Sequence, residues 1–338
     1  MDIVFDRGLH LPSLDLWMDS LRPRNGCWVS HAHTDHIASH QEFLATGATA
    51  DLMALRYKRA VGRHIDYGEP VHAEGYRITL FPAGHCLGSS QMLVEVEKTG
   101  LRVVYTGDFK LLHNPTAADC AIVPCDVLVM ESTFGEPHFT FPDTEEAVHT
   151  LDLFIKQCLN SGQVPVVFGY SLGKAQEALW HLLNLGYPVR YDHNVAGVVE
   201  VYQRWGVDFP GDHAQFDVER PSWPRGAVAL MPPGARRGPF FRALHRPRTA
   251  MLTGWAVTGP EASFHYHIDA IIPISDHADF PALVRYAQES GAGRIYTVNG
   301  SPKLAAHLRK LHIDAQHLTT ADSDAVQLSF ALEALQPA

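Results

Sequence analysis

The sequence lacks the features of a cross-linked or membrane-spanning protein. Its five cysteines include no C-x-x-C pair, which argues against a disulfide framework and against a zinc ribbon. No apolar run approaches the roughly 20 residues that cross a bilayer, and residues 1–7 are acidic rather than an apolar leader. We therefore expect a cytoplasmic protein that does not enter a membrane. At 338 residues it can form one large domain or two ordinary ones.

Positive charge is also scarce, but it is unevenly spread. The formal net charge is −10, which taken alone argues against a nucleic-acid partner. Between Glu219 and Glu261, however, there is no acidic residue. The same window contains seven arginines, Arg220, Arg225, Arg236, Arg237, Arg242, Arg246 and Arg248. Such a local basic stretch fits a phosphate-rich ligand, and a solvated arginine-rich loop explains it equally well.

The order of the expected elements predicts an α/β protein. Up to residue 130, short apolar runs alternate with Gly, Pro and Asp turns, which indicates a layered α/β sandwich. Helix–strand–loop–helix–strand follows over 142–191, the unit of a parallel sheet and so of a separate α/β domain. The expected strands are 3–5, 27–30, 78–82, 91–96, 103–106, 127–130, 164–168, 189–191, 250–253, 270–274 and 294–298. The expected helices lie near 14–21, 50–60, 144–159, 175–183, 281–290 and 302–311.

Histidine is abundant, with 21 residues, and three of them are clustered in Ser30-His31-Ala32-His33-Thr34-Asp35-His36. Imidazole and carboxylate at this spacing after an apolar strand are typical of a metal-binding loop. His31 and His33 alternate on an extended chain and so face one ion. Asp35 and His36 follow a turn and can face a second ion. A fortuitous histidine-rich loop is the weaker interpretation.

Four further candidates each follow an expected strand: Asp6, His85, Asp108 and His277. We expect one ion to take His31, His33 and His85, and the other to take Asp35, His36 and His277. Asp108 would bridge the two ions, and Asp6 would orient a ligand histidine. Zinc suits this ligand set best, with manganese or iron as alternatives. Two such ions can activate a hydroxide between them and neutralise charge on a phosphoryl group.

The loop 169–174 leads into an expected helix and carries Ser171 and Lys174. Free backbone N–H groups at a helix start can bind phosphate, although simple capping by Ser171 is the more economical interpretation. The spacing is not that of a Walker A loop, so no nucleoside triphosphate site is expected.

These motifs together resemble the metallo-β-lactamase superfamily, and within it the β-CASP nucleases. The superfamily motifs match at Asp6, His31-x-His33-x-Asp35-His36, His85 and Asp108. The β-CASP pattern matches at Glu131 in 131–135 (ESTFG), at His277 in 275–279 (SDHAD) and over 162–177. The resemblance implies an αββα sandwich from residues 1–135 and 262–338, with an inserted β-CASP α/β domain at 136–261. It also implies phosphodiester cleavage of DNA or RNA in the cleft between them, with Asp35 and Glu131 as catalytic residues.

One position departs from the RNA-processing members, which carry a histidine where this chain has Asn299. The Artemis-like DNA nucleases lack it too, and the compact length resembles bacterial ligase-associated DNA exonucleases. The resemblance thus favours a DNA exonuclease of repair that acts with an ATP-dependent DNA ligase and a helicase. Because an amide has no transferable proton at neutral pH, we expect metal-bound water or Asp35 to manage the protons.

The same resemblance turns Ser171, Lys174, Arg236 and Arg237 into candidate DNA contacts. Three alternatives remain open at this point. They are an RNA-cleaving β-CASP enzyme, a small-molecule hydrolase of the glyoxalase II or lactonase kind, and a scaffold subunit that has lost its metals. The inserted domain argues against the second, and the complete ligand set argues against the third.

Overall fold

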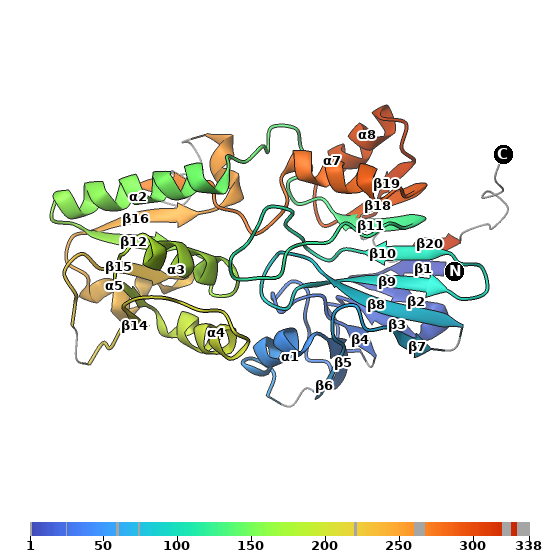
Figure 1. The fold of residues 1–338 in the computed structure, drawn as a ribbon, viewed down its shortest axis with the longest axis horizontal. Coiled ribbons are helices and arrows are strands. Elements are labelled where there is room, and N and C mark those ends of the chain that lie inside the picture. The colour runs from blue at the N-terminus through green and yellow to red at the C-terminus, as the bar shows by residue number, and fades with distance from the viewer. Residues whose placement is uncertain are drawn as a thin grey trace.

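The computed structural model describes residues 2–24, 26–58, 61–73, 75–219, 222–259, 268–319 and 326–329. Three sheets organise these residues (Figure 1). The first sheet has seven strands, in the order β20 (Val326–Ser329), β1 (Asp2–Phe5), β2 (Leu9–Leu11), β3 (Leu16–Met18), β4 (Cys27–Trp28), β5 (Glu42–Ala45) and β6 (Val61–His64). The second has β19 (Ala315–His317), β18 (Arg294–Val298), β11 (Val127–Glu131), β10 (Arg102–Tyr105), β9 (Ser90–Val96), β8 (Tyr76–Pro82) and β7 (Val71–Ala73).

These two sheets form a sandwich with one apolar core between them. Leu9, Leu11 and Trp28 of the first sheet and Leu80 and Val129 of the second belong to the same buried cluster. Helices α7 (Phe280–Glu289) and α8 (Lys303–Lys310) cover the outer face of the second sheet, and α1 (Gly47–Ala54) packs beside β6. This arrangement confirms the expected αββα sandwich.

The third sheet is built from the inserted part of the chain. All its strands are parallel, in the order β14 (His213–Gln215), β13 (Val189–Tyr191), β15 (Val228–Met231), β12 (Val164–Phe168), β16 (Pro247–Leu252) and β17 (Ala270–Ile272). Helices α2 (Thr144–Asn160), α3 (Lys174–Asn184) and α4 (His193–Arg204) share one core with it, and α5 (Pro239–Ala243) adds to a smaller cluster. Figure 1 shows this α/β unit on the left and the sandwich on the right.

The expected domain boundary at 261/262 lies outside the described residues. The next described strand, β17, still pairs with β16 of the third sheet, so the chain returns to the sandwich only after Ile272. Among the described residues, no helix is both long and apolar enough to cross a membrane.

Most expected elements are confirmed, and one is wrong. The strands over 164–168, 189–191 and 294–298 have the predicted bounds. The helix expected near 14–21 is instead a 3-10 turn, η1 (Pro12–Leu14), followed by β3. The physical reason is tertiary: β3 pairs with both β2 and β4, and sheet pairing overrides a short helical periodicity.

Strand direction gathers the functional loops. Strands β3 to β6 are mutually parallel, as are β10, β11, β18 and β19. Ligands bind at the carboxyl ends of parallel strands in α/β sheets. The loops that follow β4, β10 and β11 in the sandwich, and β12 and β16 in the third sheet, line one shared cleft.

Candidate active site

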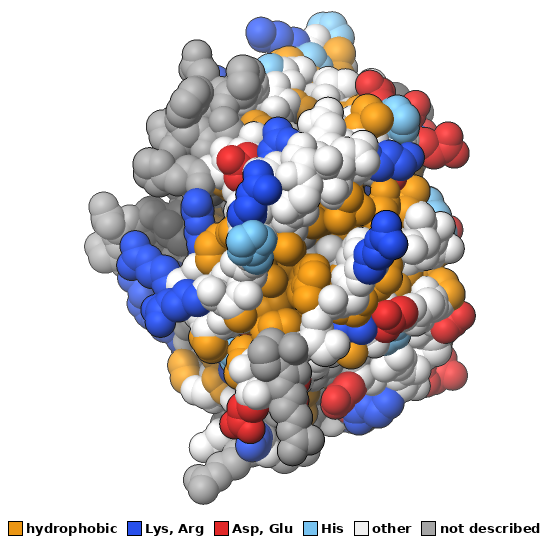
Figure 2. Space-filling model, turned by 90° about the vertical axis from the view of Figure 1, so that its left-hand side faces the viewer, with side chains coloured by type: hydrophobic (Ala, Val, Ile, Leu, Met, Phe, Trp, Pro, Cys, Tyr) orange, Lys and Arg blue, Asp and Glu red, His pale blue; other side chains and the backbone are white. Residues whose placement is uncertain are grey.

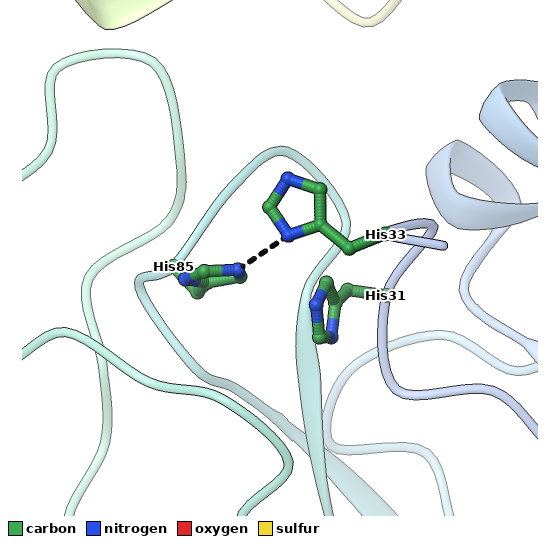
Figure 3. Close-up of side chains that lie close together, drawn as sticks. All are labelled: His31, His33 and His85. Atoms are coloured by element: carbon green, nitrogen blue, oxygen red, sulfur yellow. Dashed lines mark hydrogen bonds between the residues drawn. The ribbon is translucent and has the colours of Figure 1, made fainter. Parts of the chain in front are cut away.

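Three histidines from two loops form the first group of ligand atoms (Figure 3). His31 and His33 follow β4, and His85 follows β8. One nitrogen of each ring lies within 4.8 Å of the others, and His85 Nε2 is 2.9 Å from His33 Nδ1. His31 Nε2 is buried and has no hydrogen-bond partner. A buried imidazole nitrogen without a partner, facing two others, fits a metal ligand far better than a structural histidine.

A second group shares His31 and adds His36 and Asp108. The Asp108 Oδ2 atom lies 3.1 Å from His36 Nε2 and 3.6 Å from His31 Nε2. The other oxygen, Asp108 Oδ1, is buried without a partner. Asp108 also belongs to a group with Glu131 and His277. The carboxylate thus stands between the groups, in the place expected of a bridging ligand.

The pKa values follow from burial and these neighbours. Burial lowers the pKa of His31 well below its ordinary value, and it lowers that of His85 to about 3. At His36, burial also lowers the pKa, but Asp108 and Asp19 outweigh it and raise the pKa well above its ordinary value. The first group is therefore a set of neutral imidazoles with available lone pairs, as metal ligation requires.

Each of the four clustered histidines is held at its other ring nitrogen. Such contacts fix the tautomer and orientation of ligand rings. The contacts are His31 Nδ1 to Ser30 Oγ at 2.9 Å, His33 Nε2 to the Leu172 carbonyl at 3.0 Å, His85 Nδ1 to the Asp276 carbonyl at 2.7 Å and His36 Nδ1 to Asp19 Oδ2 at 2.9 Å. Leu172 belongs to the loop after β12, so the inserted unit takes part in orienting the cluster.

The residue that orients His36 is Asp19, and the expectation for Asp6 needs correction. Asp19 is buried and accepts hydrogen bonds from Ser30 and from Tyr105 Oη, besides contacting His36. Asp6 instead forms an ion pair of 3.3 Å with Arg22, with a side chain 41% exposed. Asp19 directly follows β3, so the strand-then-carboxylate signal used elsewhere could have found it. The helix wrongly expected over 14–21 hid that signal.

Glu131 and His277 form a pair beside the cluster. His277 Nδ1 lies 3.0 Å from Glu131 Oε2, and Glu131 Oε1 accepts a bond from the Phe109 N–H. Burial lowers the pKa of His277, but Glu131 and Asp108 outweigh it and raise the pKa to about 9. Asp35 is exposed and lines the cleft. Among the described residues it belongs to none of the groups of close ligand atoms.

The cluster opens into a cleft of about 580 Å³ between the sandwich and the inserted unit. Loop 170–174 after β12 and loop 253–255 after β16 form its far wall. Its lining includes Ser171, and its lysine and arginine residues, among those described, are Arg56 and Lys174. Arg236 and Arg237 lie in η2 (Pro233–Arg237), outside this lining.

Lys174 is part of a buried ion pair. Its Nζ lies 2.9 Å from Asp276 Oδ1, and the side chains are 5% and 3% exposed. The N-cap of α3 is Gly173, at φ +81°, so the expected capping by Ser171 is wrong. A second buried pair, Lys110 with Glu177, also joins the sandwich to α3. Breaking either pair would leave a buried charge without its partner, which is costly. Both pairs therefore hold the inserted unit in place beside the cluster.

Comparisons with known proteins agree with this geometry. No protein-family model matches the chain. The chain is similar to a "Probable DNA ligase" of Opitutus terrae, with 38% identity over 317 residues, 93% of this chain and 31% of the relative. It is similar to "RNase aCSPSF2" of Saccharolobus solfataricus, with 29% identity over 52% of this chain and 42% of that protein. An "RNase J-like protein" of Methanocaldococcus jannaschii is 29% identical over 45% of this chain and 41% of its own length. The chain thus spans less than half the length of each of these curated relatives.

Proposed function

Because the chain belongs to the β-CASP metallo-β-lactamase nuclease family, we propose that it is a metal-dependent exonuclease of DNA. The observation that carries the proposal is the pair of buried, unpartnered atoms His31 Nε2 and Asp108 Oδ1 among four histidines at the floor of a cleft. Two divalent ions would occupy the cluster, as in the dinuclear sites of the family. Zinc is the first candidate because imidazole and carboxylate ligands suit it, with manganese and iron next.

On this proposal His31, His33 and His85 would hold one ion, Asp35, His36 and His277 would hold the other, and Asp108 would be shared. The three histidines form one group of close ligand atoms, and His36 and His277 each lie in a group with Asp108, whereas Asp35 lies in no such group among the described residues. When bound, the ions supply Lewis-acid polarisation of the scissile phosphate and activation of the attacking water. The chain itself contributes orientation: His31, His33, His36 and His85 are held at their other ring nitrogens. Glu131 is held by the Phe109 N–H and by His277. The proposed proton-transfer groups are Glu131, which lies in a group with Asp108 and His277, and Asp35, which lines the cleft.

DNA is the proposed substrate, and RNA is the runner-up. The relative named as a DNA ligase is 38% identical over 93% of the chain, whereas the relatives named as RNases are less similar, at 29% over 52%, 29% over 45% and, for an "Endoribonuclease YSH1" of Candida glabrata, 24% over 72%. Asn299 supports the same choice, because it places an amide where the RNA-processing members carry a histidine. Since the ligase-named relative is about three times longer than the matched segment, we also propose an ATP-dependent DNA ligase as a functional partner.

Arg236 and Arg237 are proposed to extend the substrate path beyond the cleft. They follow β15, the neighbour of β12 in the all-parallel third sheet, so they lie at the same edge as the cleft loops. Figure 2 looks onto the opposite, outer end of this unit, away from the cleft, where lysine and arginine side chains lie among hydrophobic ones and most acidic side chains lie to the right. A phosphate contact at Arg237 predicts that Arg237→Ala reduces the salt slope of DNA binding by about one. An unchanged slope places the path elsewhere.

Digestion of matched strands tests the proposal. DNA and RNA of one sequence, labelled at the 5′ or the 3′ end, are incubated with the protein in zinc, manganese or chelator. Stepwise shortening of DNA that needs metal is the expected result, and the end from which products arise gives the polarity. The His33→Ala variant serves as the inactive control. Faster cleavage of RNA than of DNA would show that the protein is an RNA-processing enzyme. No cleavage of either strand would refute the proposal that it is a nuclease.

A further inference from the structure

A second cavity lies next to the cleft, and one tryptophan borders both. This cavity has a volume of about 390 Å³ and is lined by residues that include Glu136, His138, Asn299 and Ser301. Within the described part of the chain, Thr133 and Trp255 alone line both cavities. A strand with a phosphate at the His/Asp cluster therefore passes Trp255 if it continues into the second cavity.

Hydrogen bonds hold the backbone around Trp255 in place. Trp255 lies in η3 (Gly254–Thr258), where its backbone N–H donates a hydrogen bond to the Thr253 hydroxyl oxygen. Its backbone carbonyl accepts a hydrogen bond from the Thr258 hydroxyl. The Thr253 N–H is in turn bonded to the Ile272 carbonyl of β17. The backbone that carries the indole is thus tied to the third sheet, and little ordering remains when a ligand binds.

The indole contacts two buried aromatic rings. Phe134 and Phe139 follow β11, and each is 3% exposed. Their ring centroids lie 5.2 Å and 5.1 Å from that of Trp255. Trp255 itself remains 45% exposed. The Phe134 ring is tilted by 58° and the Phe139 ring stands at 89° to the indole, so neither is stacked parallel on it. An indole held by such contacts and still nearly half exposed can offer a face to a stacking base.

The chemistry around Trp255 selects the ligand. The adjoining cleft carries the phosphate-directed groups, whereas the indole offers an apolar π surface. Nucleobases are the part of a nucleic acid that stacks on such surfaces, and every base has a π face, so stacking does not depend on sequence. The faces of a base inside a duplex are covered by its neighbours. A strand must be unpaired next to the cleaved bond for one of its bases to reach the indole.

We propose that Trp255 is a base-stacking site that binds the nucleotide beside the scissile phosphate and so selects unpaired strand ends. This inference rests on the proposed nuclease function and specifies its substrate class. Tyr170, 56% exposed on the loop after β12, lines only the first cavity. Among the exposed aromatic side chains that the structure describes in these linings, Trp255 is the one that borders both cavities.

The test compares Trp255→Leu and Trp255→Phe with the wild-type protein. Leucine keeps an apolar side chain but removes the π face, and phenylalanine retains one. Loss of a stacked base predicts that Trp255→Leu weakens binding of a single-stranded oligonucleotide by about 5- to 150-fold. Trp255→Phe should lose less. The matched control is Trp205→Leu, because Trp205 is 46% exposed and lines neither cavity. Thermal unfolding of each variant confirms that it is folded.

Oligonucleotides with a single abasic site separate stacking from a structural role. With the base beside the cleaved bond removed, the wild-type protein should lose the same factor in affinity, and Trp255→Leu should lose nothing further. Two results would overturn the stacking site without affecting the proposed nuclease function. One is that Trp255→Leu binds the intact oligonucleotide as tightly as the wild-type protein does. The other is that Trp255→Leu binds every abasic oligonucleotide more weakly than the wild-type protein does. If the wild-type protein neither binds nor cleaves any nucleic acid, the proposed function fails and the stacking site fails with it.

Discussion

Replacing Asp19 by asparagine tests whether this carboxylate organises the cluster. Four donors converge on it: the Ser30 N–H at 2.7 Å, the Ser30 hydroxyl at 2.7 Å, His36 Nδ1 at 2.9 Å and Tyr105 Oη at 3.1 Å. An amide keeps one acceptor oxygen, which can serve the three donors at Oδ2. Its NH₂ group then faces the Ser30 N–H, and because both groups are donors, this hydrogen bond is lost. The loss of one buried hydrogen bond to a charged group predicts destabilisation by about 1.5–3 kcal/mol.

The effect on metal binding should be specific to the second ion. Without a negative charge behind it, the His36 imidazole is a weaker ligand, and loss of such a partner typically lowers metal affinity by about 10- to 100-fold. Competition with a chromophoric chelator measures this affinity, and urea unfolding in the presence of chelator measures stability. Asp6→Asn is the control, because its exposed pair with Arg22 is worth about 0–1 kcal/mol. Weakened metal binding in Asp6→Asn together with unchanged binding in Asp19→Asn would refute the assignment.

Three further substitutions have definite expected outcomes. Lys174→Met should destabilise the protein by about 3 kcal/mol in urea unfolding, because the buried Asp276 loses its lysine and keeps the more distant His277 Nε2 at 3.9 Å; Lys156→Met, whose lysine side chain is 60% exposed, should cost about 1 kcal/mol or less. Gly300→Ala should cost about 1–3 kcal/mol, because a Cβ there would overlap the Ser132 carbonyl oxygen; Gly234→Ala, whose Cβ would meet nothing within 4 Å, should stay within about 0.5 kcal/mol. Glu131→Gln should lower kcat on labelled DNA by about 10²- to 10⁴-fold with KM little changed; a change confined to KM would instead assign Glu131 to substrate binding.

The sequence predicted the fold best where the pattern was local. The apolar run at 164–168 and the periodic helix over 144–159 are confirmed because a buried parallel strand and an amphipathic helix each show in a short window. The strand β3 has only three residues, and its identity depends on pairing with β2 and β4. No window of the sequence contains that information.

The same limit applies to the site. The spacing of histidine and aspartate in loop 31–36 is typical of a metal-binding loop, so a metal site could be predicted there from the sequence. The roles of Asp19 and Lys174 depend on partners far away in the chain, His36 and Tyr105 for the first and Asp276 for the second. A lysine at a helix start looks like a phosphate ligand until its buried counter-ion is known. Sequence spacing therefore predicted candidate metal ligands, but it did not predict the groups that hold them in place.

The most direct test of the account is to measure metal content and DNA cleavage on the same samples. Purified protein is stripped with chelator, reloaded with zinc or manganese, and its bound metal is counted before single-stranded DNA is added. The account predicts two ions per chain, no cleavage after stripping and recovery on reloading. It also predicts that His33→Ala loses metal and cleavage together. Full cleavage by stripped protein, or by a His33→Ala variant that holds no metal, would contradict it.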